Sequence, residues 1–105
     1  MAWEDDPQKK EGLDIKERRK TRQPRKYKVI FHNDDYTTME FVIHVLKTYF
    51  HKSHPEATAT MLRIHHQGRG VAGVYTRDVA ATKIKQVTAE ARADGMPLKL
   101  TMEPE

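Results

Sequence analysis

Hydrophobic side chains alternate with their neighbours in two stretches of the chain, at positions 27–31 and 98–102. A period of two places every second side chain on the same face of a strand, so each stretch is predicted to be a strand with one face on a core. Residues 71–76 are short, apolar and rich in β-branched side chains. They are predicted to form a further strand.

A helix is predicted directly after the first strand. Apolar residues recur at helical spacing from Val42 to Tyr49, which gives this segment one apolar face. Thr37 and Glu40 have the T-x-x-E spacing of a capping box, in which each side chain accepts a hydrogen bond from the other residue's amide. The helix is therefore expected to begin at Thr38 and to end near residue 51.

Two more helices are predicted between the remaining strands. Ser53 and Glu56 repeat the capping-box spacing, and Pro55 stands in the first turn, where its missing amide proton does no harm. This helix should begin near residue 54 and end at the two glycines of residues 68–70. The last helix is expected over residues 76–94, with an acidic residue near the positive end of its dipole.

The predicted order of elements is β-α-α-β-α-β. The β-α-β crossover makes the second and third strands parallel to each other, so both can flank the first strand in antiparallel orientation. The expected fold is therefore α+β, with two layers: a three-stranded antiparallel sheet packed on one face against three helices.

The amino-terminal quarter of the chain has a different composition. Residues 1–24 are dense in charge, contain two prolines and have few large apolar side chains. Such a segment cannot bury enough apolar surface to offset the entropy of ordering. We expect a disordered extension over residues 1–24 and a single folded domain over residues 25–105.

Overall composition narrows the class of protein. The 105 residues include no cysteine, which excludes disulfides, thiolate metal sites and cysteine nucleophiles. No apolar run approaches the roughly 20 residues of a membrane span, and the first residues lack the pattern of a signal peptide. These features predict a soluble, cytoplasmic protein without a membrane partner.

Basic residues are concentrated in one stretch, although the formal net charge is only +4. Residues 18–28 contain seven basic and no acidic side chains: Arg18, Arg19, Lys20, Arg22, Arg25, Lys26 and Lys28. Such a stretch suits nucleic acid or an acidic partner surface, and a solvated, self-repelling tail is the other interpretation. A basic nucleic-acid-binding module that uses residues 18–28 is therefore the alternative function.

Asn33, Asp34 and Asp35 lie in the turn between the first strand and the first helix. One such residue would satisfy an ordinary turn. Three in a row place several acceptor oxygens at one rim, which suits a cation or an ammonium group. The two aspartates also suggest paired catalytic carboxylates, but no recognisable nucleophile, phosphate loop or HExxH motif accompanies them. We therefore expect no catalytic residues and no enzymatic activity.

The histidines raise a metal hypothesis. His44, His51 and His54 lie near the end of one predicted helix and in the following turn, and three such ligands would make a catalytic type of zinc site. Their spacing is not one of the established zinc motifs, and scattered surface histidines are the other interpretation. We expect neither a metal nor a cofactor. His65 shares a helix face with Met61, where it is either a satisfied core residue or a functional group.

Two segments resemble a known family. The sequences YKVIFHNDDYTTMEFVIHVL and MLRIHHQGRGVAGVYTRDVAATK, together with their order and spacing, are similar to the ClpS adaptors, which deliver N-degron substrates to the ClpAP protease. The resemblance covers residues 26 to about 102. One departure is Thr38, at a position where the family usually has proline. The resemblance implies the same two-layer fold.

The resemblance also implies roles for particular residues. Binding of the free α-amino group of a peptide is implied for Asn33, Asp34, Asp35 and His65. An adjoining pocket for a bulky hydrophobic first residue (Leu, Phe, Tyr or Trp) is implied for Thr37, Met39, Val42, Met61, Ile64 and Leu98. Docking on the N-terminal domain of a ClpA-type AAA+ unfoldase is implied for Asp78 and Lys83. The resemblance thus implies a monomeric adaptor that modulates substrate choice.

Overall fold

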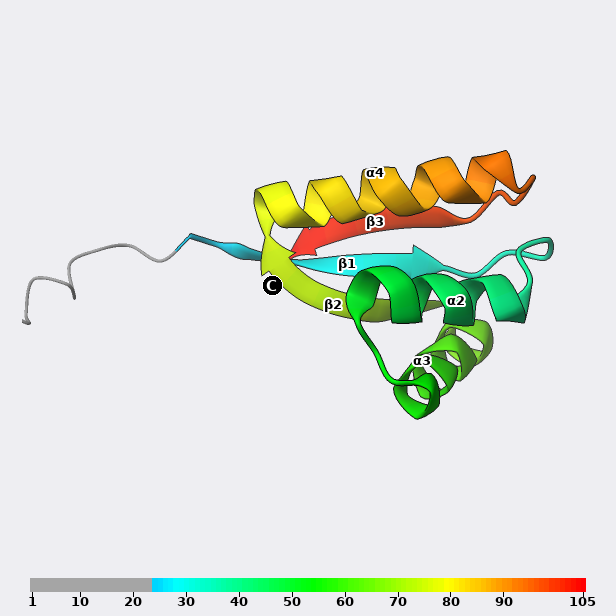
Figure 1. Cartoon of the computed structure of the whole chain (residues 1–105). Coiled ribbons are helices and arrows are strands. Elements are labelled where there is room, and N and C mark those ends of the chain that lie inside the picture. The colour runs from blue at the N-terminus through cyan, green and yellow to red at the C-terminus, as the bar shows by residue number, and fades with distance from the viewer. Residues whose placement is uncertain (1–23) are drawn as a thin grey trace, which may run out of the picture.

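The computed structural model describes residues 24–105. Apart from Pro24, the predicted disordered extension lies outside the described residues, as do the basic residues at positions 18–22. The elements follow in the order β1 (Lys26–His32), α2 (Met39–Phe50), α3 (His54–Gln67), β2 (Arg69–Thr76), α4 (Arg77–Ala93) and β3 (Lys99–Pro104) (Figure 1). The predicted order of strands and helices is confirmed.

The three strands form one sheet in the order β2-β1-β3 (Figure 1). Both outer strands are antiparallel to β1, as predicted. The β1–β2 register shifts between Val29 and Ile30, because Val29 pairs with Gly73 and Ile30 with Val71. Ala72 is therefore an extra residue on β2, the arrangement of a β-bulge. In the shifted register, Gly70 lies opposite Phe31.

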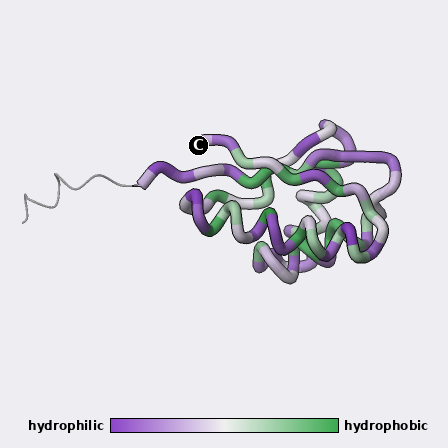
Figure 2. Tube along the Cα trace, turned by 90° about the horizontal axis from the view of Figure 1, so that it is seen from above, coloured by the Kyte–Doolittle hydropathy of each residue, from purple (hydrophilic) through white to green (hydrophobic). Residues whose placement is uncertain are grey.

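The hydrophobic core lies between the sheet and the three helices. It takes alternate residues of the strands and the apolar faces of the helices, and hydrophilic and hydrophobic positions accordingly alternate along the tube in Figure 2. Val29, Phe31, Val45, Leu46 and Val87 are among its most deeply buried members. The α+β, two-layer prediction is thus confirmed.

The first helix does not begin as predicted. Thr38, not Thr37, is the N-cap of α2, and its side-chain oxygen accepts a hydrogen bond from the Phe41 amide at 3.1 Å. The predicted capping box between Thr37 and Glu40 is therefore wrong. Adjacent threonines offer two candidate caps, and in the structure the hydroxyl of Thr37 binds Asp34 instead.

The second helix begins as predicted. Ser53 accepts from the Glu56 amide, and the Glu56 carboxylate accepts from the Ser53 amide, so the capping box is complete. Gly68 ends the helix in the left-handed conformation, with φ at 88°, which glycine adopts without steric cost. Gly70 does not contribute to this helix end, because it already belongs to β2.

The sheet face opposite the helices is crossed by an ion pair. Arg69 on β2 and Glu103 on β3 approach to 2.8 Å, although β1 lies between their strands. Ile30, in the middle of β1 and outside the main core cluster, is fully buried. None of the helices in residues 24–105 combines the length and hydrophobicity that a membrane span requires.

Candidate functional site

The turn between β1 and α2 is organised by the carboxylate of Asp34. Its Oδ1 accepts hydrogen bonds from the amides of Tyr36 and Thr37, at 2.8 and 2.7 Å. Its Oδ2 accepts a third from the Thr37 hydroxyl at 2.7 Å. Asp34 therefore fixes the shape of the turn, and its neighbours Asn33 and Asp35 are exposed at the rim.

These contacts decide the charge state of Asp34. Burial alone would raise the pKa of its carboxyl group. The hydrogen bonds from Thr37 and Tyr36, together with the positive charge of Arg92, outweigh that effect and lower the pKa below its ordinary value. Hydrogen bonds to a carboxylate favour its charged form. Asp34 is therefore a fixed negative charge at neutral pH.

A backbone contact joins this turn to the end of α3. The Asn33 amide donates to the carbonyl of Gly68 at 2.9 Å. Since Gly68 caps α3, the bond brings the last turns of α3, which carry Met61, Ile64 and His65, alongside the turn. Residues that are about thirty positions apart in sequence thus face one hollow.

We call this hollow the turn pocket. Its volume is about 340 Å³, and it is lined by Asn33, Asp34, Asp35, Thr37, Thr38, Met39, Val42, Met61, Ile64 and His65. The apolar side chains of Val42, Met61 and Ile64 are buried, whereas Asn33, Asp35 and His65 are exposed at the mouth. The structure therefore brings together nine of the ten residues predicted for amino-group binding and for the hydrophobic pocket.

Leu98 is the residue that the structure does not place in the lining. It is buried in the core just before β3, with 1% of its surface exposed. Its carbonyl accepts a hydrogen bond from Arg92, which also donates to the carbonyl of Met96. Met96 Sδ in turn lies 4.0 Å from the Thr38 hydroxyl. Arg92 thus supports a segment next to the pocket, a role that its exposed position on a predicted helix did not reveal.

The chemistry of the turn pocket follows from its two halves. The mouth presents a charged carboxylate, further acceptor oxygens and the His65 ring, which together suit a positively charged donor. The interior is apolar and includes one buried methionine, a flexible side chain that adapts to differently shaped groups. A ligand that joins an ammonium group to an apolar side chain would satisfy both halves.

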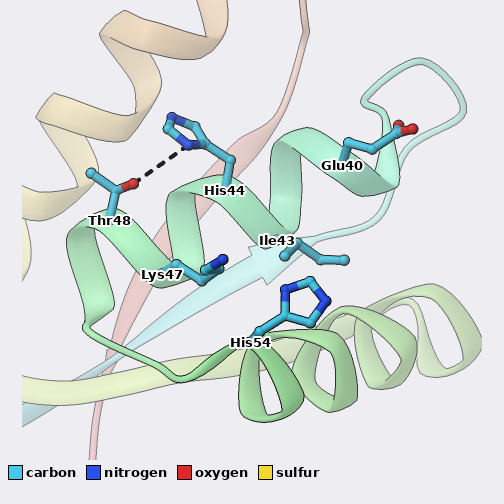
Figure 3. Close-up of a pocket in the computed structure, with 6 residues that line it drawn as sticks. All are labelled: Glu40, Ile43, His44, Lys47, Thr48 and His54. Carbon is cyan, nitrogen blue, oxygen red and sulfur yellow. Dashed lines mark hydrogen bonds between the residues drawn. The ribbon is translucent and has the colours of Figure 1, made fainter.

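A second hollow, the helix groove, is larger but contains none of the residues predicted for amino-group binding, for the hydrophobic pocket or for unfoldase docking. It has a volume of about 440 Å³ and is lined by Glu40, Ile43, His44, Lys47, Thr48 and His54 (Figure 3). His44 points away from His54 in this view. Its ring nitrogen lies 2.8 Å from the Glu90 carboxylate of α4. The groove lies between α2, which supplies five of its six lining residues, and the start of α3.

The three histidines of the metal hypothesis are not brought together. His44 faces Glu90 on α4, and His51 is the left-handed C-cap of α2. His54 begins α3 and lies beside Ile43 (Figure 3). Within residues 24–105, no three His, Asp or Glu side chains are grouped closely enough to hold a metal ion.

Asp78 and Lys83 lie on α4, away from the turn pocket. They border a shallow hollow of about 240 Å³ with Val79, Thr82 and Gln86. Asp78 is exposed. The ammonium of Lys83 donates to the Tyr49 carbonyl at 2.6 Å and lies over the rings of Phe50 and Tyr75. Lys83 therefore has a structural role that its sequence position did not suggest.

The fold and the turn pocket define a small α+β binding domain with an acceptor-rich mouth and an apolar interior. Residues 22–101 match the family model described as ATP-dependent Clp protease adaptor protein ClpS. The chain therefore belongs to the ClpS family of Clp protease adaptors.

Known proteins agree with this assignment. A ClpS adapter of Desulfatibacillum aliphaticivorans is 63% identical over 86 residues, which cover 82% of this chain and 83% of that protein. One of Burkholderia mallei strain SAVP1 is 50% identical over 98% of both chains. The solved structure of Agrobacterium tumefaciens ClpS2 bound to L-phenylalaninamide is 43% identical, with a TM-score of 0.76 over 79% of this chain and 100% of that one.

Proposed function

We propose that this adaptor binds the free α-amino group and the bulky hydrophobic first residue of N-degron substrates. It delivers them to the ClpA unfoldase of the ClpAP protease and so modulates substrate choice. The observation that carries the proposal is the combination of an acceptor-rich mouth with an apolar interior in the turn pocket. The ligand of the similar Agrobacterium protein, L-phenylalaninamide, has a free α-amino group next to an aromatic side chain.

The amino group is bound at the mouth of the pocket. An α-ammonium offers three donors and a positive charge, and it meets the Asn33 side-chain oxygen, a His65 ring nitrogen and the Asp35 carboxylate. Asp34, which is held by Thr37 and Tyr36, contributes negative charge. An internal peptide bond has one amide proton and no charge, so it would leave this cradle with unpaired polar groups.

The first side chain enters the apolar interior. Val42, Met61 and Ile64 form its buried wall, and Thr37, which Asp34 holds in the turn, completes the lining. Met39, which is 46% exposed at the start of α2, stands at the entrance and disfavours β-branched residues by crowding near their Cβ. Leu98, which the resemblance assigns to this pocket, is buried in the core and does not line it.

The exposed face of α4 is the docking surface for the unfoldase. Asp78 is exposed there, and Val79 exposes 44% of its surface beside it. Lys83 contributes through the part of its ammonium that is not bound to Tyr49. Because this face and the turn pocket lie on different elements, substrate and unfoldase can be bound together. The adaptor takes part in delivery by binding and catalyses no reaction.

We place the adaptor in the cytoplasm as a monomer. A chain without cysteine requires no oxidising compartment for its stability. Recognition of the substrate also needs no second copy, because a single chain supplies the mouth and the interior of the pocket.

A titration with short fluorescent peptides tests the proposal. Peptides that begin with Leu, Phe, Tyr or Trp should bind, and the same peptides with an acetylated amino terminus should not, since acetylation removes the charge and two donors. Equal binding of free and acetylated peptides would refute the amino-group mechanism. Nucleic-acid binding by residues 18–28 would instead weaken steeply with added salt, whereas a partly buried peptide contact should respond weakly.

A further inference from the structure

Gly70 is a buried glycine whose backbone does not require glycine. It lies in β2 opposite Phe31. Among the described glycines, only Gly68 and Gly95 have a positive φ. Conformational freedom therefore does not explain Gly70. Glycine is needed at this position because a larger side chain would have no room.

The side chain of Ile64 occupies the place that a side chain at position 70 would need. A Cβ added to Gly70 would lie 2.8 Å from Cγ1 of Ile64, closer than carbon atoms pack. The same Cβ would lie 3.6 and 3.7 Å from the backbone N and Cα of Ile64, which are ordinary contacts. A methyl group at position 70 would therefore displace the Ile64 side chain and leave the backbone of α3 in place.

Ile64 separates Gly70 from the turn pocket. Its side chain is 3% exposed and lines the pocket beside Met61 and Val42. On its other side it contacts Gly70. A push from Gly70 consequently moves Ile64 toward the pocket, because protein interiors are too densely packed to absorb a methyl group elsewhere.

We infer that Gly70 determines how large a first side chain the turn pocket accepts. It is a positioning residue that acts through Ile64: glycine at this site lets Ile64 pack against β2 and keeps the pocket deep. This inference rests on the proposed function, since it concerns the side chain that enters the same pocket. A shallower pocket affects the largest side chains first.

The test is the affinity of Gly70→Ala for free peptides that differ only in their first residue. Leu peptides should bind within about threefold of the unsubstituted protein, and Trp peptides should lose roughly tenfold or more, since one methylene in an apolar pocket changes discrimination by about 10–200-fold. An unchanged ratio of Leu to Trp affinity would overturn the inference. Failure of the unsubstituted protein to bind any free peptide would instead overturn the proposed function.

Gly73→Ala is the matched control on the same strand. The atoms nearest to a Cβ there belong to Tyr75, which does not line the turn pocket. Its ratio of Leu to Trp affinity should equal that of the unsubstituted protein. If Gly73→Ala shifted the ratio as much as Gly70→Ala, strand destabilisation and not the Ile64 contact would be the cause, and the inference would be lost.

A double substitution keeps the test decisive if Gly70→Ala fails to fold. Ile64→Ala removes the crowded Cγ1 atom, so adding Gly70→Ala to it creates no clash. Ile64→Ala and the double variant should therefore show the same ratio of Leu to Trp affinity. A selective loss of Trp binding in the double variant would mean that position 70 acts without Ile64, contrary to the inference.

Discussion

The hydroxyl of Thr37 donates to the carboxylate of Asp34 over 2.7 Å, so a side chain expected to cap a helix holds a turn instead. Thr37→Val keeps the shape of the residue and removes this hydrogen bond. We expect a loss of about 1 kcal/mol in the free energy of unfolding, measured by urea denaturation at neutral pH.

The same variant should also respond less to acid. The folded-state pKa of Asp34 is lowered, so its stabilising contribution is present above the unfolded pKa of 3.8 and is lost as pH falls through the folded value. Without the Thr37 hydroxyl that loss is smaller. If Thr37→Val and the unsubstituted protein lost stability equally below pH 4, the carboxylate would not depend on this contact.

Removal of acceptors from the pocket mouth should weaken peptide binding without unfolding the protein. Asn33 and His65 are both exposed, so Asn33→Ala and His65→Ala should remain folded. Hydrogen bonds to a charged group contribute about 1.5–3 kcal/mol, and each substitution should weaken the binding of a Leu-initiated peptide by roughly ten- to a hundredfold. Normal affinity in folded Asn33→Ala would contradict the proposed cradle.

Met39→Ala should broaden the range of accepted first residues. Met39 lies at the entrance of the pocket and is 46% exposed, so its truncation creates no buried cavity. Peptides that begin with Val or Ile should gain affinity, and those that begin with Leu or Phe should retain it. Fluorescence anisotropy with these four peptides checks the expectation, and continued exclusion of Val and Ile would assign the discrimination to another residue.

The contact between α2 and α4 should stabilise the fold near neutral pH and lose this effect in acid and in base. Glu90 accepts from the Tyr49 hydroxyl at 2.6 Å and lies 2.8 Å from the His44 ring nitrogen. The Tyr49 hydrogen bond, followed by that from His44, lowers the pKa of Glu90, and the Glu90 hydrogen bond raises the pKa of Tyr49. The stabilisation from ionised Glu90 is therefore lost as pH falls below 4.5. The stabilisation from protonated Tyr49 is lost as pH rises above 10.

Glu90→Gln tests this pH dependence, because it keeps the shape of the side chain and removes the charge. Its unfolding midpoint should change less than that of the unsubstituted protein at both extremes of pH. Identical pH profiles of the two proteins would show that the contact does not contribute.

Charge reversal on α4 should separate delivery from peptide binding. Asp78 is exposed and makes no contact with the turn pocket, so Asp78→Arg should abolish ClpA-dependent degradation of an N-degron substrate and leave peptide affinity unchanged. Lys83→Ala is less suitable, since it also removes the hydrogen bond to Tyr49. Unimpaired degradation with Asp78→Arg would place the docking surface elsewhere.

Local signals in the sequence predicted the framework of the fold well. The capping box at Ser53 and the alternation around Val29 each correspond to an observed helix start or strand. These features depend on neighbours within a few residues, so sequence spacing is sufficient to detect them. The start of α2 was misplaced because Thr37 and Thr38 are equivalent as local caps, and only the turn formed by Asp34 distinguishes them.

The sequence predicted the contacts around the candidate site less completely. The resemblance identified most of the lining, but the contact between Ile64 and Gly70 depends on the shift in β2 register. Arg92 reaches two backbone carbonyls of the segment before β3, and Lys83 reaches the end of α2. The Lys83 contact joins residues 34 positions apart. The other contacts join residues only four to six positions apart, but they lie in different elements, and no periodicity records where the chain turns between them.

The central position of β1 gives the two ends of the folded domain different mechanical strength. A pulling force applied ahead of Lys26 acts on β1, which pairs with β2 on one side and with β3 on the other. Sliding that strand strains both ladders together. A load applied at the carboxyl end acts on β3, an edge strand with one ladder, whose hydrogen bonds can separate one after another. A pull along β1 from the amino end must therefore break two ladders, whereas a pull on β3 from the carboxyl end meets only one.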